Sequence, residues 1–321
     1  MAIQYINPLS RAFERMKIIL FRPFDLGKWF ALGFTAFLAS LMNSPGGAGG
    51  GGNYNIKDKD FEWDAFFRLP SGIMEWISAH PLWAALIIAG IFIALVIVVL
   101  LIWLSSRGMF MFLDNVVHNR SLIEKPWREF KTRGDSLFLW RLAFMIITFL
   151  VFSGTTITAF LLAYKNYLEG VNLFSNLLSI LWIAFIGFLL LFVAFYIWLF
   201  LDNFVVPIMY KTGFTANKSW LKFLELLEKH PMHFILYGLY IICLYIVVVI
   251  CVVVAGLLTC CCGFILISIP YIGSVLMLPV SVTFRALSLE YLEQFGDEYR
   301  IFPVAADDAG VSADENVNPI V

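Results

Sequence analysis

The sequence has little charge for its length. Charged residues make up 14% of its 321 residues, whereas a soluble domain carries about 25%. The hydrophobic share is 61% and the mean hydropathy is +0.85. This composition excludes an ordinary soluble domain and is typical of membrane proteins. The formal net charge is −1, so the sequence also lacks the surplus of Lys and Arg that general binding of nucleic acid requires.

Motifs of catalysis and metal binding are missing from the sequence as well. It contains no H-E-x-x-H, no G-x-S-x-G and no pair of acids inside an apolar run. The cysteines lack C-x-x-C spacing, and His230 and His233 have no evident third ligand. We expect the adjacent Cys260, Cys261 and Cys262 to pack as small apolar residues, with a redox or lipidation role as the alternative. We therefore expect no enzyme activity, no cofactor and no metal.

Long apolar runs are what the sequence has in abundance. A helix needs about 20 apolar residues to cross a bilayer, and a spanning segment must satisfy its backbone hydrogen bonds internally. The sequence therefore predicts an all-α polytopic membrane protein with six transmembrane helices. The predicted spans are residues 24–43, 81–105, 137–163, 175–201, 232–258 and 263–286.

Some features inside and between these runs carry predictions of their own. The first run follows a charged segment without a small-residue cleavage site, so we do not expect a signal peptide. The glycine run at 46–52 reads as a flexible linker. Pro270 and Pro279 predict a bend in the last span. We expect Thr155 and Thr158 to hydrogen bond within their own helix or to a neighbour, with a substrate path as the alternative.

Three amphipathic segments precede the first, third and fifth runs. They are residues 8–22, 121–132 and 217–229, and each places apolar residues at helical spacing. Aromatic faces flanked by Lys and Arg suit the interface of a membrane with anionic headgroups. The candidate interfacial lipid contacts are Phe13, Trp127, Phe130, Trp220 and Phe223.

A short motif of an aromatic residue, leucine, an acid and an amide closes the second, fourth and sixth runs. Its copies begin at residues 112, 200 and 291, and such regular recurrence indicates an internal repeat. We therefore predict three hairpin repeats, each opened by an interfacial helix, at residues 8–115, 121–203 and 215–294. They form a single membrane domain, residues 1–296, and the acidic residues 297–321 form a disordered tail. The candidate polar residues of the motif are Asp114, Asn115, Asp202, Asn203, Glu293 and Gln294.

Two roles are open to the three acids of this motif. They converge around a pseudo-threefold axis and bind a cation or a lipid headgroup, or each holds the following interfacial helix through backbone N–H groups or a local arginine. The second role is favoured, because acids at the interface are far less costly than acids in the middle of the membrane and need no ligand to explain them.

The distribution of Lys and Arg predicts the orientation. Basic residues concentrate at the N-terminus and in the loops that follow the second and fourth runs. Because such loops face the cytoplasm, we expect both termini, the three interfacial helices and the three acids on the cytoplasmic side.

The repeated pattern, which ends in the sequence Arg-Ala-Leu-Ser-Leu-Glu-Tyr-Leu-Glu-Gln-Phe-Gly at 285–296, resembles uncharacterised prokaryotic six-span membrane proteins. These are similar to the membrane domain attached to some glycerophosphodiester phosphodiesterases. The resemblance covers residues 8–296 and implies an integral membrane module without an agreed activity. The catalytic barrel of those phosphodiesterases has no counterpart in the sequence, so their activity is not expected here.

The sequence thus favours a non-enzymatic protein of the bacterial or archaeal inner (plasma) membrane. It would act as a scaffold or a lipid-interacting module through its interfacial helices. Its expected partners are membrane lipids, and a protein partner at these helices or at the tail is left open. The alternative is a transporter that carries a small solute or a lipid through the helix bundle, although the few charges within the spans disfavour ion coupling.

Overall fold

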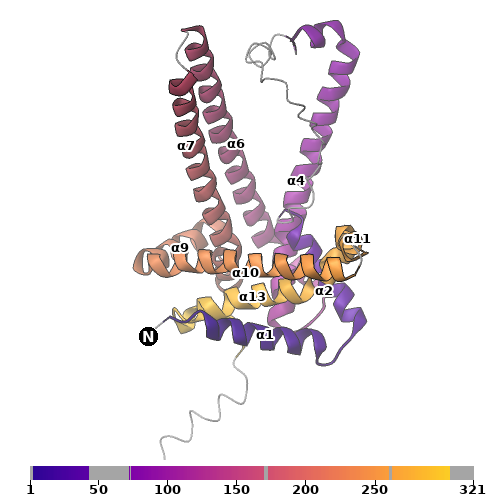
Figure 1. Cartoon of the computed structure of the whole chain (residues 1–321). Helices are drawn as coiled ribbons and strands as arrows, with labels where there is room; N and C mark the ends of the chain where they lie inside the picture. The colour runs from indigo at the N-terminus through magenta and orange to yellow at the C-terminus, as the bar shows by residue number, and fades with distance from the viewer. Residues whose placement is uncertain (1–2, 43–71, 73, 170–172, 260–261, 304–321) are drawn as a thin grey trace, which may run out of the picture. The chain divides into compact units, whose positions relative to one another are not determined.

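The computed structural model describes residues 3–42, 72, 74–169, 173–259 and 262–303. The described part is helical (Figure 1). The glycine run at 46–52, Cys260, Cys261 and most of the predicted tail, residues 304–321, lie outside it. The chain divides into two compact units. Unit 1 contains Met1–Ser40, Ser105–Leu137 and Trp198–Val321, and unit 2 contains Leu41–Leu104 and Phe138–Ile197.

The described elements, in chain order, are α1 (Ile6–Phe21), α2 (Leu26–Ser40), α4 (Pro81–Val117), α5 (Glu124–Glu129), α6 (Lys131–Leu168), α7 (Leu173–Phe200), the π-helix η2 (Leu201–Val205), α8 (Val206–Thr212), α9 (Ala216–Lys229), α10 (Pro231–Leu258), α11 (Cys262–Ser268), α12 (Pro270–Leu276), α13 (Leu278–Glu293) and the 3₁₀-helix η3 (Asp297–Tyr299).

Unit 2 consists of the greater parts of α4, α6 and α7. Large apolar side chains on these helices are exposed, among them Leu86, Phe149 and Phe188. Exposed apolar surface of this extent is stable in a bilayer and not in water. The hydroxyls of α6 bond within their own helix, as predicted, because Thr155 donates to the carbonyl of Phe152 at 2.9 Å and Thr158 to that of Gly154 at 2.8 Å.

Four helices of the described part are long and apolar enough to cross a membrane, or five if one bent pair counts as a span. The sequence predicted six. The first predicted span forms only α2, which has 15 residues, fewer than the about 20 that a crossing needs. The last predicted span is divided into α11, α12 and α13, with a bend of 63° between α12 and α13.

The predicted bend in the last span is confirmed, and its cause is local. Pro270 lies in the first turn of α12 and Pro279 in the first turn of α13. A proline lacks the N–H that an uninterrupted helix would use and fits best in a first turn. Each proline therefore begins a new helix.

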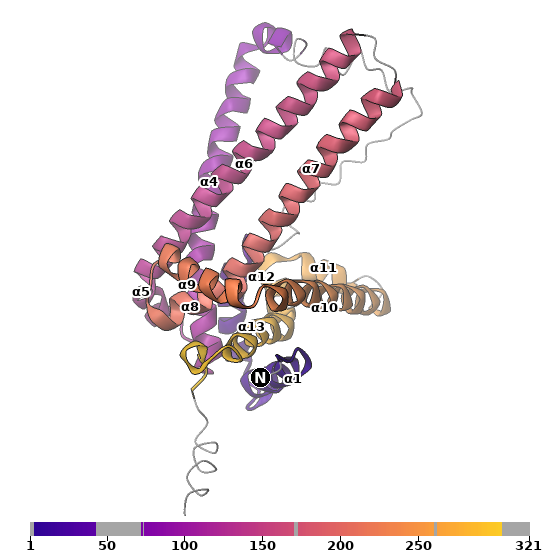
Figure 2. The same ribbon diagram turned by 90° about the vertical axis from the view of Figure 1, so that its left-hand side faces the viewer.

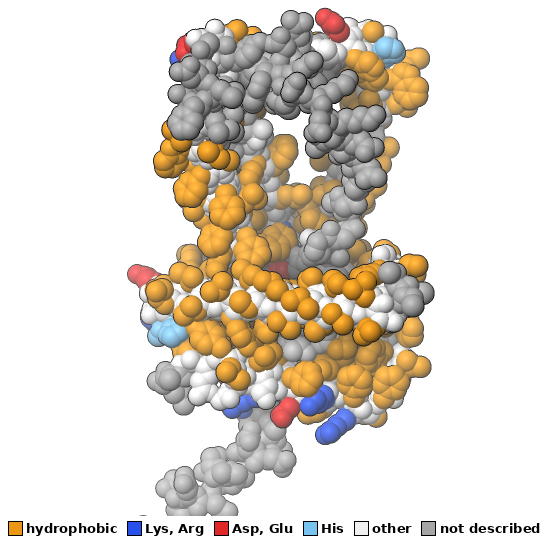
Figure 3. All heavy atoms as spheres, in the orientation of Figure 1, with side chains coloured by type: hydrophobic (Ala, Val, Ile, Leu, Met, Phe, Trp, Pro, Cys, Tyr) orange, Lys and Arg blue, Asp and Glu red, His pale blue; other side chains and the backbone are white. Residues whose placement is uncertain are grey.

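In unit 1, α1 packs along α13, and α10 lies beside them (Figures 1 and 2). The face of α1 that meets α13 is apolar, with Ala12, Met16 and Leu20 buried. Figure 3 shows hydrophobic side chains over the visible face of α10. Leu239, Val247 and Val254 of this helix are exposed. The amphipathic pattern of residues 8–22 therefore predicted the helix α1, but the stripe that packs contains Ala12 and Ile19, and Phe13 is exposed.

Glycines allow α2 to pack against its neighbours in unit 1. A Cβ atom at Gly108 on α4 would lie 2.7 Å from the carbonyl carbon of Leu38 and 2.8 Å from the amide nitrogen of Ala39. No side chain fits in that space, so the backbone of α2 lies directly on α4. Ser105 strengthens the contact, because its hydroxyl donates to the carbonyl of Ala39 at 3.0 Å.

Aromatic rings form the core of unit 1 around Phe204. Its ring stacks on that of Phe223 at 5.4 Å and meets the rings of Phe234 and Tyr237 at 5.0 and 4.9 Å. All four side chains are fully buried, and edge-to-face and stacked rings stabilise such a core beyond the area they bury. Phe223 on α9 is therefore a core residue.

The first residues of the predicted tail are ordered against unit 1. Residues 297–299 form η3, and Tyr299, Ile301 and Phe302 are buried. Lys222 binds Glu298 at 2.8 Å, and Arg15 stacks on the ring of Phe302 at 3.7 Å. This finding corrects the predicted start of the disordered tail. The prediction relied on the acidic composition of residues 297–321 and overlooked three residues, Tyr299, Ile301 and Phe302, that pack on the rest of unit 1.

Candidate functional site

The first acid–amide motif ends α4, and its acid binds a local arginine. Asp114 is buried and pairs with Arg120, six residues on, at 2.7 Å. It also accepts a hydrogen bond from the hydroxyl of Tyr210 at 2.9 Å. Such partners compensate the cost of a buried carboxylate. The sequence predicted that each acid holds the following segment through backbone N–H groups or a local arginine, and Arg120 is such an arginine.

The amide of the same motif fixes the chain before α5. The Asn115 side chain donates to the carbonyl of Leu122 at 2.9 Å and accepts from the amide N–H of Leu122 at 2.9 Å. Leu122 lies two residues before the start of α5. One side chain thus satisfies both backbone groups of a residue outside any helix, at a part-buried position where water is less available to them.

The third motif makes the same contacts at the end of α13. Glu293 lies 3.0 Å from Nε of Arg300, seven residues on. The Gln294 side chain accepts from the N–H of Gln4 at 2.8 Å and donates to its carbonyl at 3.0 Å. Gln4 lies two residues before α1. The amides of the first and third motifs therefore hold the chain at equal distances before α5 and α1.

The second motif has different contacts, because it lies in the π-helix η2. The backbone carbonyl of Asp202 accepts from Arg285 at 2.7 Å. The amide of Asn203 donates to Leu199 at 2.9 Å and accepts from Tyr237 at 3.3 Å. A π-turn holds one residue more than an α-turn and rotates the side chains that follow. Here α8 continues the chain, so Asn203 binds α10 and not a segment before α9.

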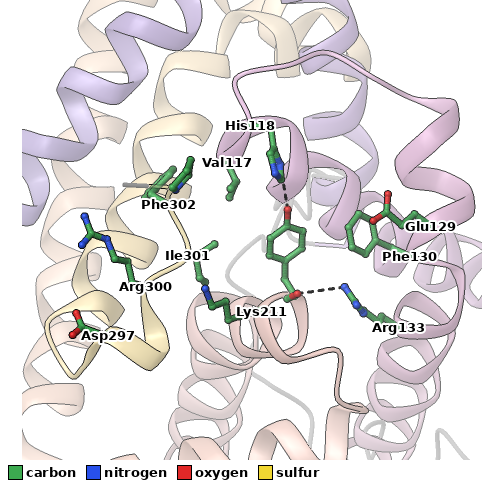
Figure 4. A pocket seen from close by; sticks show the side chains of 12 residues that line it. Val117, His118, Glu129, Phe130, Arg133, Lys211, Asp297, Arg300, Ile301 and Phe302 are labelled. Atoms are coloured by element: carbon green, nitrogen blue, oxygen red, sulfur yellow. Dashed lines mark hydrogen bonds between the residues drawn. The ribbon is translucent and has the colours of Figure 1, made fainter. Parts of the chain in front are cut away.

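A cavity of about 500 Å³ opens in unit 1 near the first and third motifs (Figure 4). Its walls carry four basic and two acidic residues together with aromatic and aliphatic ones. The lining residues are Val117, His118, Glu129, Phe130, Arg133, Tyr210, Lys211, Asp297, Arg300, Ile301, Phe302 and Pro303.

Each basic residue of the cavity comes from a different element. His118 follows the end of α4, Arg133 lies in the first turn of α6, Lys211 in the last turn of α8, and Arg300 directly after η3. In the view of Figure 4, Lys211 lies between Arg300 and Arg133. Because His118 and Arg300 are 182 residues apart in the sequence (300 − 118), only the folded chain brings this set together.

Tyr210 links two of these basic residues. Arg133 donates to the Tyr210 carbonyl at 3.3 Å, and the Tyr210 hydroxyl lies 3.4 Å from Nδ1 of His118 (Figure 4). The Arg133 guanidinium also lies 5.2 Å from the centre of the Phe130 ring. Stacking on an aromatic face and a carbonyl contact fix the guanidinium without neutralising its charge.

The structure places the candidate lipid contacts in two groups. Phe13 on α1 is 47% exposed, and Trp127 and Trp220 are partly exposed. Phe223 is fully buried and Phe130 is 4% exposed, so the prediction that these two contact lipid is corrected. An apolar stripe on a helix can contact either lipid or protein. Both residues contact protein, because Phe130 packs on Tyr210 and Phe223 on Phe204.

The two histidines that lack an evident third ligand, His230 and His233, lie at the start of α10. Their ring centres are 6.1 Å apart, and Nδ1 of His233 lies 3.4 Å from the hydroxyl of Tyr5. Among the described residues no group of three or more His, Cys, Asp or Glu side chains is placed to hold a metal ion.

Fold and exposed surface together define a helical protein of the multi-pass membrane class. The chain belongs to the family described as "Family of unknown function (DUF7544)", whose model matches residues 3–295. That match includes all three acid–amide motifs. It ends just before residues 297–303, which form one wall of the cavity. No curated protein matches the chain, and no solved structure does.

Proposed function

We propose that this protein is a non-enzymatic module of the bacterial or archaeal inner membrane that interacts with lipid headgroups on the cytoplasmic side. One observation carries the proposal. Unit 1 gathers all three basic stretches, the one around α1, the one between α4 and α6, and the one from α8 to α9. Basic residues at the ends of spans favour the cytoplasmic side and attract anionic lipids.

The same grouping supports the finer proposal of a repeated hairpin with both termini in the cytoplasm. The acids that follow the second, fourth and sixth predicted spans, Asp114, Asp202 and Glu293, all lie in unit 1. The matching amide contacts of Asn115 and Gln294 support a repeated unit. The resemblance to the membrane domain attached to some phosphodiesterases agrees with a module of this kind, and no phosphodiesterase activity is proposed.

Lipid retention tests the proposal. The full-length protein would be extracted from membranes of mixed composition, and the lipids that remain bound would be identified by native mass spectrometry. We expect anionic lipids to be enriched over their share in the membrane, and less so at high salt, because screening weakens charge attraction. Retention in proportion to membrane composition would contradict a headgroup-binding role.

A transporter is the second candidate, and the bundle helices offer one observation against it. Thr155 and Thr158 hydrogen bond to carbonyls of their own helix, so they present no free donor to a solute. Proteoliposomes that show protein-dependent solute flux without lipid enrichment would favour the transporter.

A further inference from the structure

We propose that the cavity of unit 1 binds the phosphate group of an anionic ligand, and that Arg133 and Lys211 are its principal cationic contacts. The inference rests on the proposed function, which it deepens by naming a site and a ligand class. The cavity volume of about 500 Å³ lies within the roughly 300–1,000 Å³ typical of small-molecule sites.

The charges that face the cavity favour an anion. In the described part of the chain, Lys211 forms no ion pair, and Arg133 binds a backbone carbonyl and no carboxylate. Of the other basic groups, Arg300 lies against Glu293 and His118 against Asp114, at 3.2 Å. Arg133 and Lys211 therefore form no ion pair with a described carboxylate.

The acidic groups at the cavity leave this charge in place. Asp114 is occupied by Arg120, and Glu293 by Arg300. Glu129 and Asp297 line the cavity but are exposed to solvent, as Lys211 also is, and the fields of such exposed groups are screened. Arg133 is only partly exposed, so its charge is the least screened of the four. A phosphate group, with several acceptor oxygens, matches a fixed guanidinium and a nearby ammonium better than a neutral ligand does.

The remaining walls indicate that the ligand also has an apolar part. Val117, Phe130, Ile301 and Phe302 contribute apolar surface, which a bare phosphate ion would leave without a partner. The cavity residues come from the ends of α4, α6 and α8, the level at which span-flanking basic residues meet headgroups. A phospholipid headgroup or a soluble phosphate ester has the required chemistry.

The experiment uses the full chain in nanodiscs of zwitterionic lipid. Two probes separate the two sources of phosphate, a fluorescent phosphatidic acid mixed into the nanodisc and soluble glycerol 3-phosphate. The test variant is R133Q/K211Q, and Lys229→Gln, an exposed position at the end of α9 that does not line the cavity, is the matched control. Circular dichroism and gel filtration establish that each variant folds, and Lys211→Arg keeps the charge if the double variant does not fold.

We expect R133Q/K211Q to bind at least one probe about tenfold or more weakly, because each lost charge-assisted hydrogen bond is worth about that factor. Lys229→Gln and Lys211→Arg should bind as the native protein does. Loss of the lipid probe alone assigns the phosphate to a headgroup, and loss of soluble phosphate ester binding assigns it to a free metabolite. Equal binding of both probes by R133Q/K211Q and the native protein would overturn the site.

The outcomes separate the site from the proposed function. If anionic lipids remain enriched in R133Q/K211Q to the native extent and both probes bind as they do to the native protein, the protein interacts with headgroups elsewhere and the cavity proposal is wrong. If the native protein shows no lipid enrichment but binds glycerol 3-phosphate in a manner that R133Q/K211Q loses, the cavity is a phosphate site and the headgroup role is wrong.

Discussion

At the scale of single residues, the acid–amide motifs show what a short sequence echo can specify. In the first and third copies the amide makes the same pair of hydrogen bonds to a residue two positions before a helix. The acid of each copy lies against an arginine in the segment that follows. Such contacts are expected if the motifs hold neighbouring segments of the chain. The sequence favoured this role over ligand binding, because placing an acid near the membrane interface costs little free energy.

Replacement of the two amides tests this role. Asn115→Leu leaves the backbone groups of Leu122 without partners, and we expect it to lower the free energy of unfolding by about 1–3 kcal/mol. Gln294→Leu should cost less, because its contacts with Gln4 are exposed and water replaces them. Thermal unfolding of the detergent-purified variants measures both. A larger loss for Gln294→Leu would contradict the assignment.

Tyr299 makes stability depend on pH in the alkaline range. Burial, first, and the charge of Glu298 raise its pKa from 10.0 to about 12. The folded state therefore holds the proton more tightly than the unfolded state, so the contribution of Tyr299 is complete below about pH 10 and is lost as the pH rises toward 12. Unfolding temperatures measured across this range should fall more steeply for the native protein than for Tyr299→Phe. Parallel curves would show that Tyr299 is not buried.

At the scale of elements, the helices were predictable and their neighbours were not. Apolar periodicity at 8–22 and 217–229 predicted α1 and α9, and prolines predicted the breaks around α12 and α13. Periodicity identifies a buried stripe but not what buries it, so Phe223 was assigned to lipid although it packs in the core. The π-turn at η2 carries no sequence signal, and it alters the contacts of the second motif.

The contact between α2 and α4 gives a prediction at this scale. Gly108→Ala should destabilise unit 1, because the added Cβ would meet the backbone of α2 at 2.7 Å, and a backbone cannot rotate away as a side chain can. The control is Gly154→Ala on α6, where no described atom beyond the local helix backbone lies within 4 Å of the added Cβ. There alanine should be neutral or stabilise by up to about 1 kcal/mol. Thermal unfolding in detergent compares the two. Equal effects would show that α2 does not lie on α4.

At the scale of the whole molecule, composition and charge were sufficient to predict a helical membrane protein. They were not sufficient to predict the number of spans, since a run of adequate length can break at prolines or form a helix of only 15 residues. The basic cavity could not be predicted from the sequence either. Its residues are far apart in the sequence, and each basic residue also fits the ordinary positive-inside pattern. The arginines that pair with Asp114 and Glu293 could have been predicted from the sequence, because they lie only six and seven residues further along the chain.

The central claim is that the three basic stretches of unit 1 face one side of the membrane, the cytoplasm. Cysteine accessibility tests it most directly. In a variant without native cysteines, single cysteines would replace Lys17, Lys125 and Lys218, which are exposed on or beside α1, α5 and α9. A membrane-impermeant thiol reagent should label all three in inside-out vesicles and none in intact spheroplasts. Labelling of any one of them from the outer side would contradict the account.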